Sequence, residues 1–218
     1  MARYRPYVIL NAAMTLDGKI STIQKDSKIS SRKDLERVHK LRERVDAIMV
    51  GINTVIIDDP MLTARLVNGK NPARIIVDSK ARIGLNSRIM QSCDKILTII
   101  ASSESASKAK LQKIAAKGAV GLVLGKSKVD VEKLLSVLKD IGINRLLVEG
   151  GGEINWSMLL NGLVDEVMVT IAPRIVGGRN AVTLVEGQGF AKISNGIRLK
   201  LYKVSKNDSE IVLFYRAL

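Results

Sequence analysis

The 218-residue sequence is poor in cysteine and aromatic residues, and each shortage excludes some classes of protein. Cys93 is the single cysteine, so the chain cannot form an internal disulfide or a zinc site built on several cysteines. The cysteine cluster of zinc-dependent base deaminases is missing for the same reason. Aromatic residues make up 3% of the chain, which leaves few side chains for stacking on nucleic acid bases. We therefore expect no metal site and no nucleic acid partner.

Long apolar runs are also missing, because no stretch reaches the roughly 18 residues that a membrane-spanning helix requires. The first residues, MARYRPYVIL, are typical of a strand rather than of a charged leader followed by an apolar segment. A hydrophobic content of 46% is ample for a buried core. No repeat and no linker rich in proline or serine divides the chain. We expect a cytoplasmic protein with one domain over residues 1–218 and no membrane partner.

What the sequence has in excess is positive charge, with 35 Lys and Arg against 21 Asp and Glu. A net charge of +14 suits nucleic acid, an anionic membrane surface or small polyanions, and a lysine-rich surface can also serve solubility alone. The charges are spread along the chain instead of forming a basic tail. Together with the few aromatic residues, this favours small ligands that carry phosphate.

Apolar runs alternate with amphipathic segments as far as residue 148. The runs are mostly β-branched and too short for helices, so we expect strands at Tyr7–Ala13, Ala47–Gly51, Arg74–Val77, Ile96–Ala101, Val120–Leu124 and Arg145–Val148. The amphipathic segments predict helices at Ser31–Val45, Ala106–Lys117 and Val131–Ile141. In the first, Ser31 and Asp34 have capping-box spacing, and the expected apolar face comprises Leu35, Val38, Leu41 and Val45. His39 is expected on the surface of this helix.

This alternation predicts an α/β fold with a mainly parallel central sheet and helices on both faces. After Gly162 the chain has extended segments at Val164–Ala172, Arg198–Val204 and Glu210–Tyr215, with no full-length helix between them. We expect these to form an antiparallel C-terminal edge. Ligands then bind at the carboxyl ends of the parallel strands.

A glycine-rich segment follows the strand at Arg145–Val148. It reads Glu149-Gly150-Gly151-Gly152-Glu153-Ile154-Asn155-Trp156 and leads into a helix. Glycines there let a phosphate approach the backbone N–H groups at the helix N-terminus. An ordinary flexible turn is the alternative, but one glycine suffices for a turn, so three glycines favour phosphate binding. The spacing is not that of the dinucleotide-binding or P-loop fingerprints.

Two more strand ends carry polar side chains. Thr54 and Asp58 lie four residues apart after Gly51, where a short helix stops before Pro60, and they can bond ligand hydroxyls. The guanidinium of Arg65, later in the same segment, can make two parallel hydrogen bonds to a phosphate. The third strand end is Asp78-Ser79-Lys80-Ala81-Arg82, in which two cations suit the 2′-phosphate of NADP, whereas Asp78 on a ribose would favour NAD.

Five motifs together, in order and spacing, resemble the pyrimidine reductases of riboflavin biosynthesis over nearly the whole chain. They are Met14–Lys19, Gly51–Arg65, Asp78–Arg82, Leu147–Gly152 and Ala172–Gly178. The resemblance implies a dihydrofolate-reductase-like fold, a homodimer, and NADPH as cofactor. It also implies reduction of a ribosyl side chain to the ribityl form. Since the deaminase motifs are missing, the standalone type is implied, with 2,5-diamino-6-ribosylamino-4(3H)-pyrimidinone 5′-phosphate as substrate.

The same resemblance assigns site residues by motif. It places at NADPH the residues Ala13, Thr54, Asp58, Ser79, Arg82, Gly150, Gly151, Gly152, Glu153 and Ile154. It places at the substrate Arg42, Leu62, Arg65 and Glu149, with Glu149 orienting the ribose. Asn11 and Lys28 depart from the fused bacterial enzymes, which carry Lys and Trp there. Lys19 is a proton donor or simply an exposed turn residue, and Arg42 is either a ligand contact or a solvated cation.

Two alternatives stay open. A dihydrofolate reductase, or another reductase of that fold, would need a buried helical carboxylate facing the pterin and more aromatic lining. A non-catalytic protein that binds nucleotides or nucleic acid would bind RNA with steep salt dependence and never oxidise NADPH.

Overall fold

The computed structural model describes residues 4–67 and 69–218. The chain forms two compact units, each assembled from separate stretches of sequence. The first comprises residues 4–7 together with the described residues of His39–Leu147, and the second comprises Val8–Val38 and Val148–Leu218. Helix α1 (Arg32–Glu43) and strand β6 (Arg145–Val148) each begin in one unit and end in the other.

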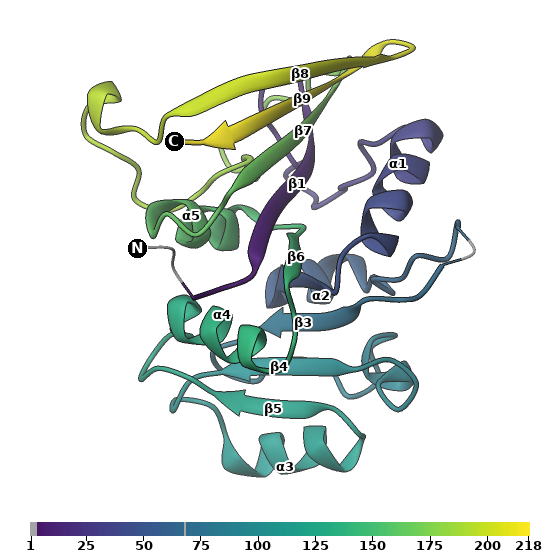
Figure 1. Ribbon diagram of the computed structural model, residues 1–218, viewed down its shortest axis with the longest axis vertical. Helices are drawn as coiled ribbons and strands as arrows, with labels where there is room; N and C mark the ends of the chain where they lie inside the picture. Colours follow the sequence, from purple (N-terminus) through teal and green to yellow (C-terminus); the bar gives the residue numbers. More distant parts are fainter. Residues whose placement is uncertain (1–3, 68) are drawn as a thin grey trace. The chain divides into compact units, whose positions relative to one another are not determined.

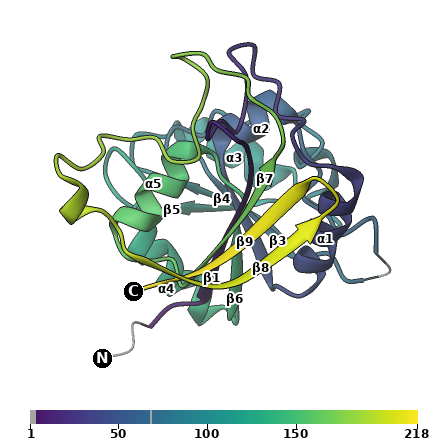
Figure 2. The same ribbon diagram turned by 90° about the horizontal axis from the view of Figure 1, so that it is seen from above.

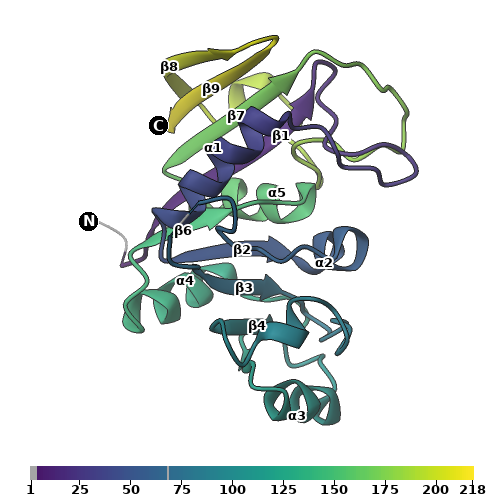
Figure 3. The same ribbon diagram turned by 90° about the vertical axis from the view of Figure 1, so that its right-hand side faces the viewer.

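The first unit is built on parallel strands. Its strands are β2 (Ala47–Gly51), β3 (Ala73–Val77), β4 (Thr98–Ser102) and β5 (Val120–Val123), paired in this order (Figures 1 and 3). Residues Ala47–Val50 of β2 are fully buried, as an uninterrupted apolar run predicts for a parallel strand covered on both faces. The carboxyl ends of these strands meet at one edge, where the loops at residues 51, 78 and 102 begin.

Helices α2 (Ile52–Asp58), α3 (Lys108–Ala116) and α4 (Val131–Asp140), and the short 3₁₀ helix η1 (Met90–Ser92), complete the first unit. Side chains cap two of them, since Ser107 accepts from the Lys110 amide and Asp130 from the Lys133 amide. Each cap satisfies a backbone donor that a helix start leaves unpaired. Leu134, Leu135 and Leu138 of α4 are fully buried, so this helix contributes to the core of the unit.

Arg74 is an unexpected core residue of the first unit, fully buried at the second position of β3. Its guanidinium donates to Thr98 Oγ1 at 2.7 Å, to Ser92 Oγ at 2.8 Å and to the Ile89 carbonyl at 3.0 Å. Burial lowers the pKa of Arg74, but an arginine stays charged at neutral pH. The residue therefore ties the irregular segment before β4 to the centre of the strands.

The second unit combines one parallel and two antiparallel strand pairs. Its order is β1 (Tyr7–Thr15), β7 (Glu166–Ala172), β9 (Glu210–Ala217) and β8 (Leu199–Asn207), with β1 parallel to β7 and the other pairs antiparallel. Figures 1 and 2 show β8 and β9 as a hairpin beside β7. Helix α5 (Gly152–Leu160) and the 3₁₀ helix η2 (Ile193–Asn195) belong to the same unit.

These elements agree in type and order with the sequence predictions. The α/β class, the mainly parallel strands and the antiparallel C-terminal strands are confirmed. None of the helices among the described residues is both long enough and apolar enough to span a membrane.

Helix α1 differs from its prediction in which face is buried. Its N-terminus is capped as expected, because Ser31 Oγ accepts from the Asp34 amide at 3.2 Å. The predicted apolar face is only partly correct, because Val38 and Val45 are buried but Leu35 is not. Leu35 is 45% exposed and Val45 lies beyond the helix end, whereas Asp34 is fully buried. A polar network, described below, takes the place of the expected leucine.

Candidate functional site

The glycine-rich segment forms an uncapped helix start in the second unit. Gly150 has φ +88°, a conformation that favours glycine, and α5 begins at Gly152 after the N-cap Gly151. No side chain caps this helix, so the first-turn amides of Gly152, Glu153 and Ile154 receive no acceptor from the cap. Such amides, together with the helix dipole, suit a phosphate.

Close packing explains the third glycine. A Cβ atom on Gly152 would lie 2.4 Å from Cγ of Glu186 and 2.8 Å from the carbonyl oxygen of Thr183. The Glu186 amide also donates to the Gly152 carbonyl at 3.2 Å. The 183–186 loop therefore rests on this helix start and leaves no space for a side chain.

Ala13 and Glu149 are the other predicted site residues of the second unit. Ala13 lies half-buried on β1, in register with Thr170 of β7. Glu149 is half-buried and directly follows β6, one residue before the glycines.

In the first unit, Thr54 and Asp58 lie on the short helix α2, as predicted. Thr54 is half-buried and Asp58 exposed, one helical turn apart. The helix ends at Asp58, and the C-cap residue Asp59 has φ +38° and accepts from the Arg88 amide at 2.9 Å. The expected stop before Pro60 is confirmed.

The loop after β3 holds Ser79 and Arg82, the other two predicted cofactor residues of the first unit. Asp78 is fully buried and its Oδ2 accepts from the Ile83 amide at 2.8 Å. Arg82 stays half-exposed, with Nε 3.7 Å from Asp78 Oδ1 and Nη2 donating to Asn53 Oδ1 at 3.2 Å. Ser79 Oγ accepts from the Val129 amide at 3.1 Å, which leaves its hydroxyl proton for an acceptor. The buried Asp78 carboxylate is thus turned toward its own loop.

Arginines gather around the segment after α2. Leu62 is buried with φ +49°, and Arg42 Nη1 donates to the neighbouring Thr63 carbonyl at 3.0 Å. Partial burial, followed by the positive charges of Arg42 and Arg88, lowers the pKa of Arg65. Like charges that lie close enough to depress a pKa attract an anion. The structure thus brings together Arg42, Leu62 and Arg65, which the family resemblance assigns to the substrate.

Arg88 is a member of this cluster that the sequence analysis missed. It lies in an irregular segment before η1, outside every strand-end motif, so no local pattern pointed to it.

His39 was also misplaced. It is 2% exposed instead of lying on the helix surface, and its Nδ1 accepts from the Leu66 amide at 3.3 Å. The ring therefore supports the segment next to Arg65.

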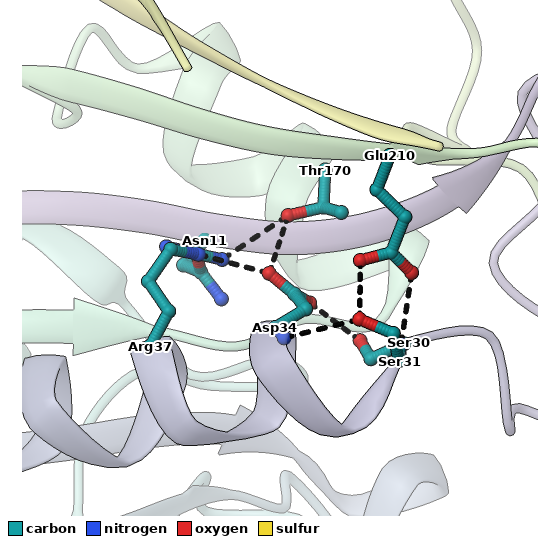
Figure 4. Close-up of polar contacts among 7 residues, drawn as sticks. All are labelled: Asn11, Ser30, Ser31, Asp34, Arg37, Thr170 and Glu210. Atoms are coloured by element: carbon teal, nitrogen blue, oxygen red, sulfur yellow. Dashed lines mark hydrogen bonds and ion pairs between the residues drawn. The ribbon is translucent and has the colours of Figure 1, made fainter. Parts of the chain in front are cut away.

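A buried polar network lies among α1, β1, β7 and β9 in the second unit (Figure 4). Asp34 accepts from Ser30 Oγ at 2.6 Å, Thr170 Oγ1 at 2.7 Å and Arg37 Nε at 2.8 Å. Arg37 Nη2 donates in turn to Asn11 Oδ1 at 2.8 Å. Asp34 is thus a buried helical carboxylate, the feature expected of a folate reductase, but donors of the protein already occupy both of its oxygens.

The capping box at the start of α1 is completed by a distant residue. The Ser31 amide donates to Glu210 Oε1 of β9 at 2.8 Å, the contact that Asp34 would make in a local box. The Asp34 side chain is thereby left to the buried network. Neither the network nor this exchange of partners has a local sequence signal.

Two of the recognised motifs bind each other. Asp17 accepts from Thr15 Oγ1 at 2.6 Å and from the Gly177 amide at 2.8 Å, and the Thr15 bond is the main cause that lowers the pKa of Asp17. Lys19 Nζ donates to the Ala181 carbonyl at 3.2 Å. The Met14–Lys19 turn thus anchors the Ala172–Gly178 segment, which gives both motifs a structural role.

Comparison with known proteins gives consistent matches. The model of the RibD C-terminal domain family matches residues 6–213. A 2,5-diamino-6-ribosylamino-4(3H)-pyrimidinone 5′-phosphate reductase of Methanothermobacter thermautotrophicus is 49% identical over 214 residues, covering 97% of this chain and 98% of that protein. A reductase of the same name from Aquifex aeolicus is 43% identical, covering 90% of each chain.

Solved structures agree on the fold. RibD of Acinetobacter baumannii superposes with a TM-score of 0.86 at 26% identity, covering 98% of this chain and 58% of that one. A dihydrofolate reductase of Enterococcus faecalis superposes with a TM-score of 0.56 at 12% identity, covering 98% of each chain. The expected dihydrofolate-reductase-like fold is confirmed.

Proposed function

Because the chain belongs to the RibD C-terminal domain family, we propose that it catalyses the NADPH-dependent reduction of 2,5-diamino-6-ribosylamino-4(3H)-pyrimidinone 5′-phosphate to the ribityl form in riboflavin biosynthesis. The observation that carries this proposal is the match to the Methanothermobacter reductase over almost the full length of both chains. The unbroken family match across both units supports a single reductase domain. A cytoplasmic location stays a prediction.

A reductase of this fold uses a nicotinamide cofactor, and we propose that the cofactor is NADPH, which supplies the hydride when bound. In the second unit we assign to it Ala13 and the residues Gly150, Gly151, Gly152, Glu153 and Ile154, because the uncapped amides suit a pyrophosphate. In the first unit we assign Thr54, Asp58, Ser79 and Arg82. The inward turn of Asp78 supports NADPH over NADH, since its carboxylate is already bonded to its own loop.

The substrate residues follow from charge and position. We propose that Arg65 and Arg42 bind the 5′-phosphate, assisted by Arg88, and that Leu62 contacts the substrate beside them. We assign Glu149 the catalytic role of accepting hydrogen bonds from the ribose hydroxyls, so that C1′ is held in a reactive orientation. Neither Lys19 nor Asp34 is proposed as proton donor, because the protein's own groups already engage both.

The test is NADPH oxidation followed by absorbance, using the purified chain without any deaminase and both the diamino substrate and its deaminated form. We expect oxidation with the diamino substrate and a ribityl product. If neither pyrimidine supports oxidation, the proposed function is wrong and the non-catalytic binding protein becomes the better hypothesis.

Cofactor preference gives a first mutational prediction. Arg82→Ala should weaken NADPH binding by about 1–3 kcal/mol, the scale for losing a charged hydrogen bond, and leave NADH binding nearly unchanged. Titration of each cofactor with the variant measures this. Arg32→Ala is the matched control, because Arg32 is exposed and, among the described residues, forms its ion pair with Glu36 one turn away. Equal losses for NADPH and NADH would refute the assignment.

We also propose a homodimer. Strand β8 ends the strand order of the second unit, and Leu201, Val204 and Ile211 on the hairpin are 47%, 55% and 42% exposed. The same strand carries Lys200, Lys203 and Lys206, so the proposal rests on the exposed apolar side chains, which are normally covered by a partner surface, and not on an uncharged edge.

Light scattering at micromolar concentration should therefore give twice the chain mass. Val204→Lys should shift the mass toward the monomer, because it replaces an exposed apolar side chain with a charge that is costly to bury against a second copy. Ile193→Lys on η2, which is 99% exposed, is the control and should leave the mass unchanged. A fully active wild-type monomer would contradict the proposal.

A further inference from the structure

The chain after β7 runs back to helix α5 as a strap, which comprises residues 181–190. Its first half is bonded to the turn that follows β1, since the Leu184 amide donates to the Gly18 carbonyl at 3.1 Å. Further along, the Glu186 amide donates to the Gly152 carbonyl at 3.2 Å, at the start of α5. The strap thus links the turn after β1 to the glycine-rich segment within the second unit.

Asn155 of α5 is a fully buried residue whose side-chain amide lies between the strap and the glycine-rich segment. Its Nδ2 donates to the Leu184 carbonyl at 2.8 Å, which fixes the orientation of the amide. A Cβ atom on Gly150 would lie 3.7 Å from this Nδ2 and 3.8 Å from Oδ1, so the amide lies directly beside that glycine. Leu184 therefore bonds the turn after β1 through its amide and α5 through its carbonyl.

The oxygen of this side chain shows what the asparagine is for. Asn155 Oδ1 is fully buried and has no hydrogen-bond partner in the described part of the chain. A buried acceptor without a donor costs free energy, and a leucine of nearly the same size would avoid that cost. What asparagine supplies and leucine cannot is the bond from Nδ2 to the strap. The role of Asn155 in this structure is therefore to hold Leu184.

The far end of the strap is held by Trp156, the single tryptophan of the chain. The indole makes an edge-to-face contact with Phe190, with 5.1 Å between the ring centroids. A Cβ atom on Gly187, which has φ +88°, would lie 2.1 Å from the same indole. Two successive residues of α5, Asn155 and Trp156, thus hold the strap at separate points.

We propose that Asn155 is a positioning residue for cofactor binding. It acts through the strap, which holds the glycine-rich segment and the turn after β1 in the arrangement that receives the cofactor pyrophosphate. This rests on the proposed function, in which Ala13 and residues 150–154 bind NADPH. These residues belong to the second unit, whereas Arg82, on which we expect the 2′-phosphate to depend, belongs to the first. A change in the strap should therefore weaken nucleotides that carry a pyrophosphate and leave adenosine 2′-monophosphate unaffected.

Asn155→Leu tests the bond to the strap, because leucine has nearly the same size and cannot donate to Leu184. We expect the Kd for NADP⁺, measured by calorimetry, to rise about tenfold, the scale for losing one well-placed hydrogen bond. The Kd for adenosine 2′-monophosphate should stay unchanged. Asn161→Leu is the matched control, because Asn161 Nδ2 also donates to a backbone carbonyl, that of Ser157 at 2.7 Å, but at the other end of α5. It should change neither value.

A second pair of variants displaces the strap without changing Asn155. Gly187→Ala presses a methyl group against the Trp156 indole, so it should weaken NADP⁺ in the same way and shift the fluorescence of Trp156. NADP⁺ suits this measurement because, unlike NADPH, it does not absorb the light that tryptophan emits. Gly189→Ala is the control, since Gly189 also has a positive φ, +68°, but a Cβ atom there meets nothing within 4 Å. It should leave NADP⁺ binding and the fluorescence unchanged.

Unchanged NADP⁺ binding in Asn155→Leu or in Gly187→Ala, or an equal loss for adenosine 2′-monophosphate, would overturn the positioning role and leave the proposed function intact. If Asn155→Leu does not fold, the two glycine variants decide the matter. Wild-type protein that binds NADP⁺ but reduces neither pyrimidine would refute the proposed reaction, and the same four variants would still decide the role of Asn155. If the wild type does not bind NADP⁺, the cofactor assignment and the positioning role fail together.

Discussion

Replacing Glu149 with glutamine should lower kcat for ribosyl reduction by about 100-fold, with much smaller changes in the substrate KM and in the Kd for NADPH. The side chain follows β6 directly and precedes Gly150, whose φ of +88° fixes the turn into α5. The role that we propose for this carboxylate is to accept hydrogen bonds from the ribose hydroxyls. An amide of the same size has a weaker acceptor and presents N–H groups that compete for the same position.

The loss falls on kcat because orientation matters most where the hydride is transferred. A small misplacement of C1′ weakens the transition state more than the ground state. Steady-state kinetics with both substrates varied separates the two effects. Glu132→Gln, on the exposed first turn of α4, is the matched control. A higher KM at constant kcat would reduce Glu149 to a binding residue, and no change would remove it from the site.

The strands and helices were predictable from the sequence because their signals are local. The apolar run at Ala47–Gly51 is buried along nearly its full length, and the Ser31 cap forms where the spacing predicts it. The change from helices to extended segments after Gly162 marks the start of the antiparallel strands. Each of these features depends on neighbours within a few residues.

Errors arose where a distant residue decides the outcome. Asp34 looks like a capping residue, yet the local contact is made by Glu210, which lies 179 positions after Ser31. Leu35 was expected in the core because apolar residues at helical spacing predict the buried face of a helix. The same pattern assigns a charged residue such as Asp34 to the exposed face. Asp34 is buried nevertheless, since Ser30, Arg37 and Thr170 satisfy its carboxylate.

The candidate site shows the same difference between features set by local sequence and features set by distant residues. Strand ends were correctly identified as the places of Thr54, Ser79 and the glycine loop, because parallel strands end together. The orientation of Asp78 was not predictable, as it depends on the Ile83 amide in the folded loop. Arg88 was missed because an irregular segment has no periodicity that would draw attention to a single arginine.

The cluster of Arg42, Arg65 and Arg88 gives the second prediction with a large expected effect on substrate binding. Arg65→Ala should raise the KM for the phosphorylated substrate by about 10- to 100-fold, the range for losing charged hydrogen bonds to a phosphate, and leave the Kd for NADPH nearly unchanged. Partial burial lowers the pKa of Arg65, and the nearby positive charges of Arg42 and Arg88 lower it further. An anion bound there removes that repulsion, so the cluster favours the phosphate more than an isolated arginine would.

The dephosphorylated substrate supplies the control for this variant. Wild-type protein should prefer the phosphorylated compound strongly, and Arg65→Ala should erase most of that preference while barely affecting the dephosphorylated one. The preference of Arg65→Lys for the phosphorylated compound should lie between those of the wild type and Arg65→Ala. Lysine keeps the positive charge but loses the paired hydrogen bonds that a guanidinium makes to a phosphate. The preference of the wild type should also fall as salt is raised, since exposed charges are screened. If Arg65→Ala impaired both compounds equally, Arg65 would support the fold of its segment, and the phosphate would have to bind elsewhere.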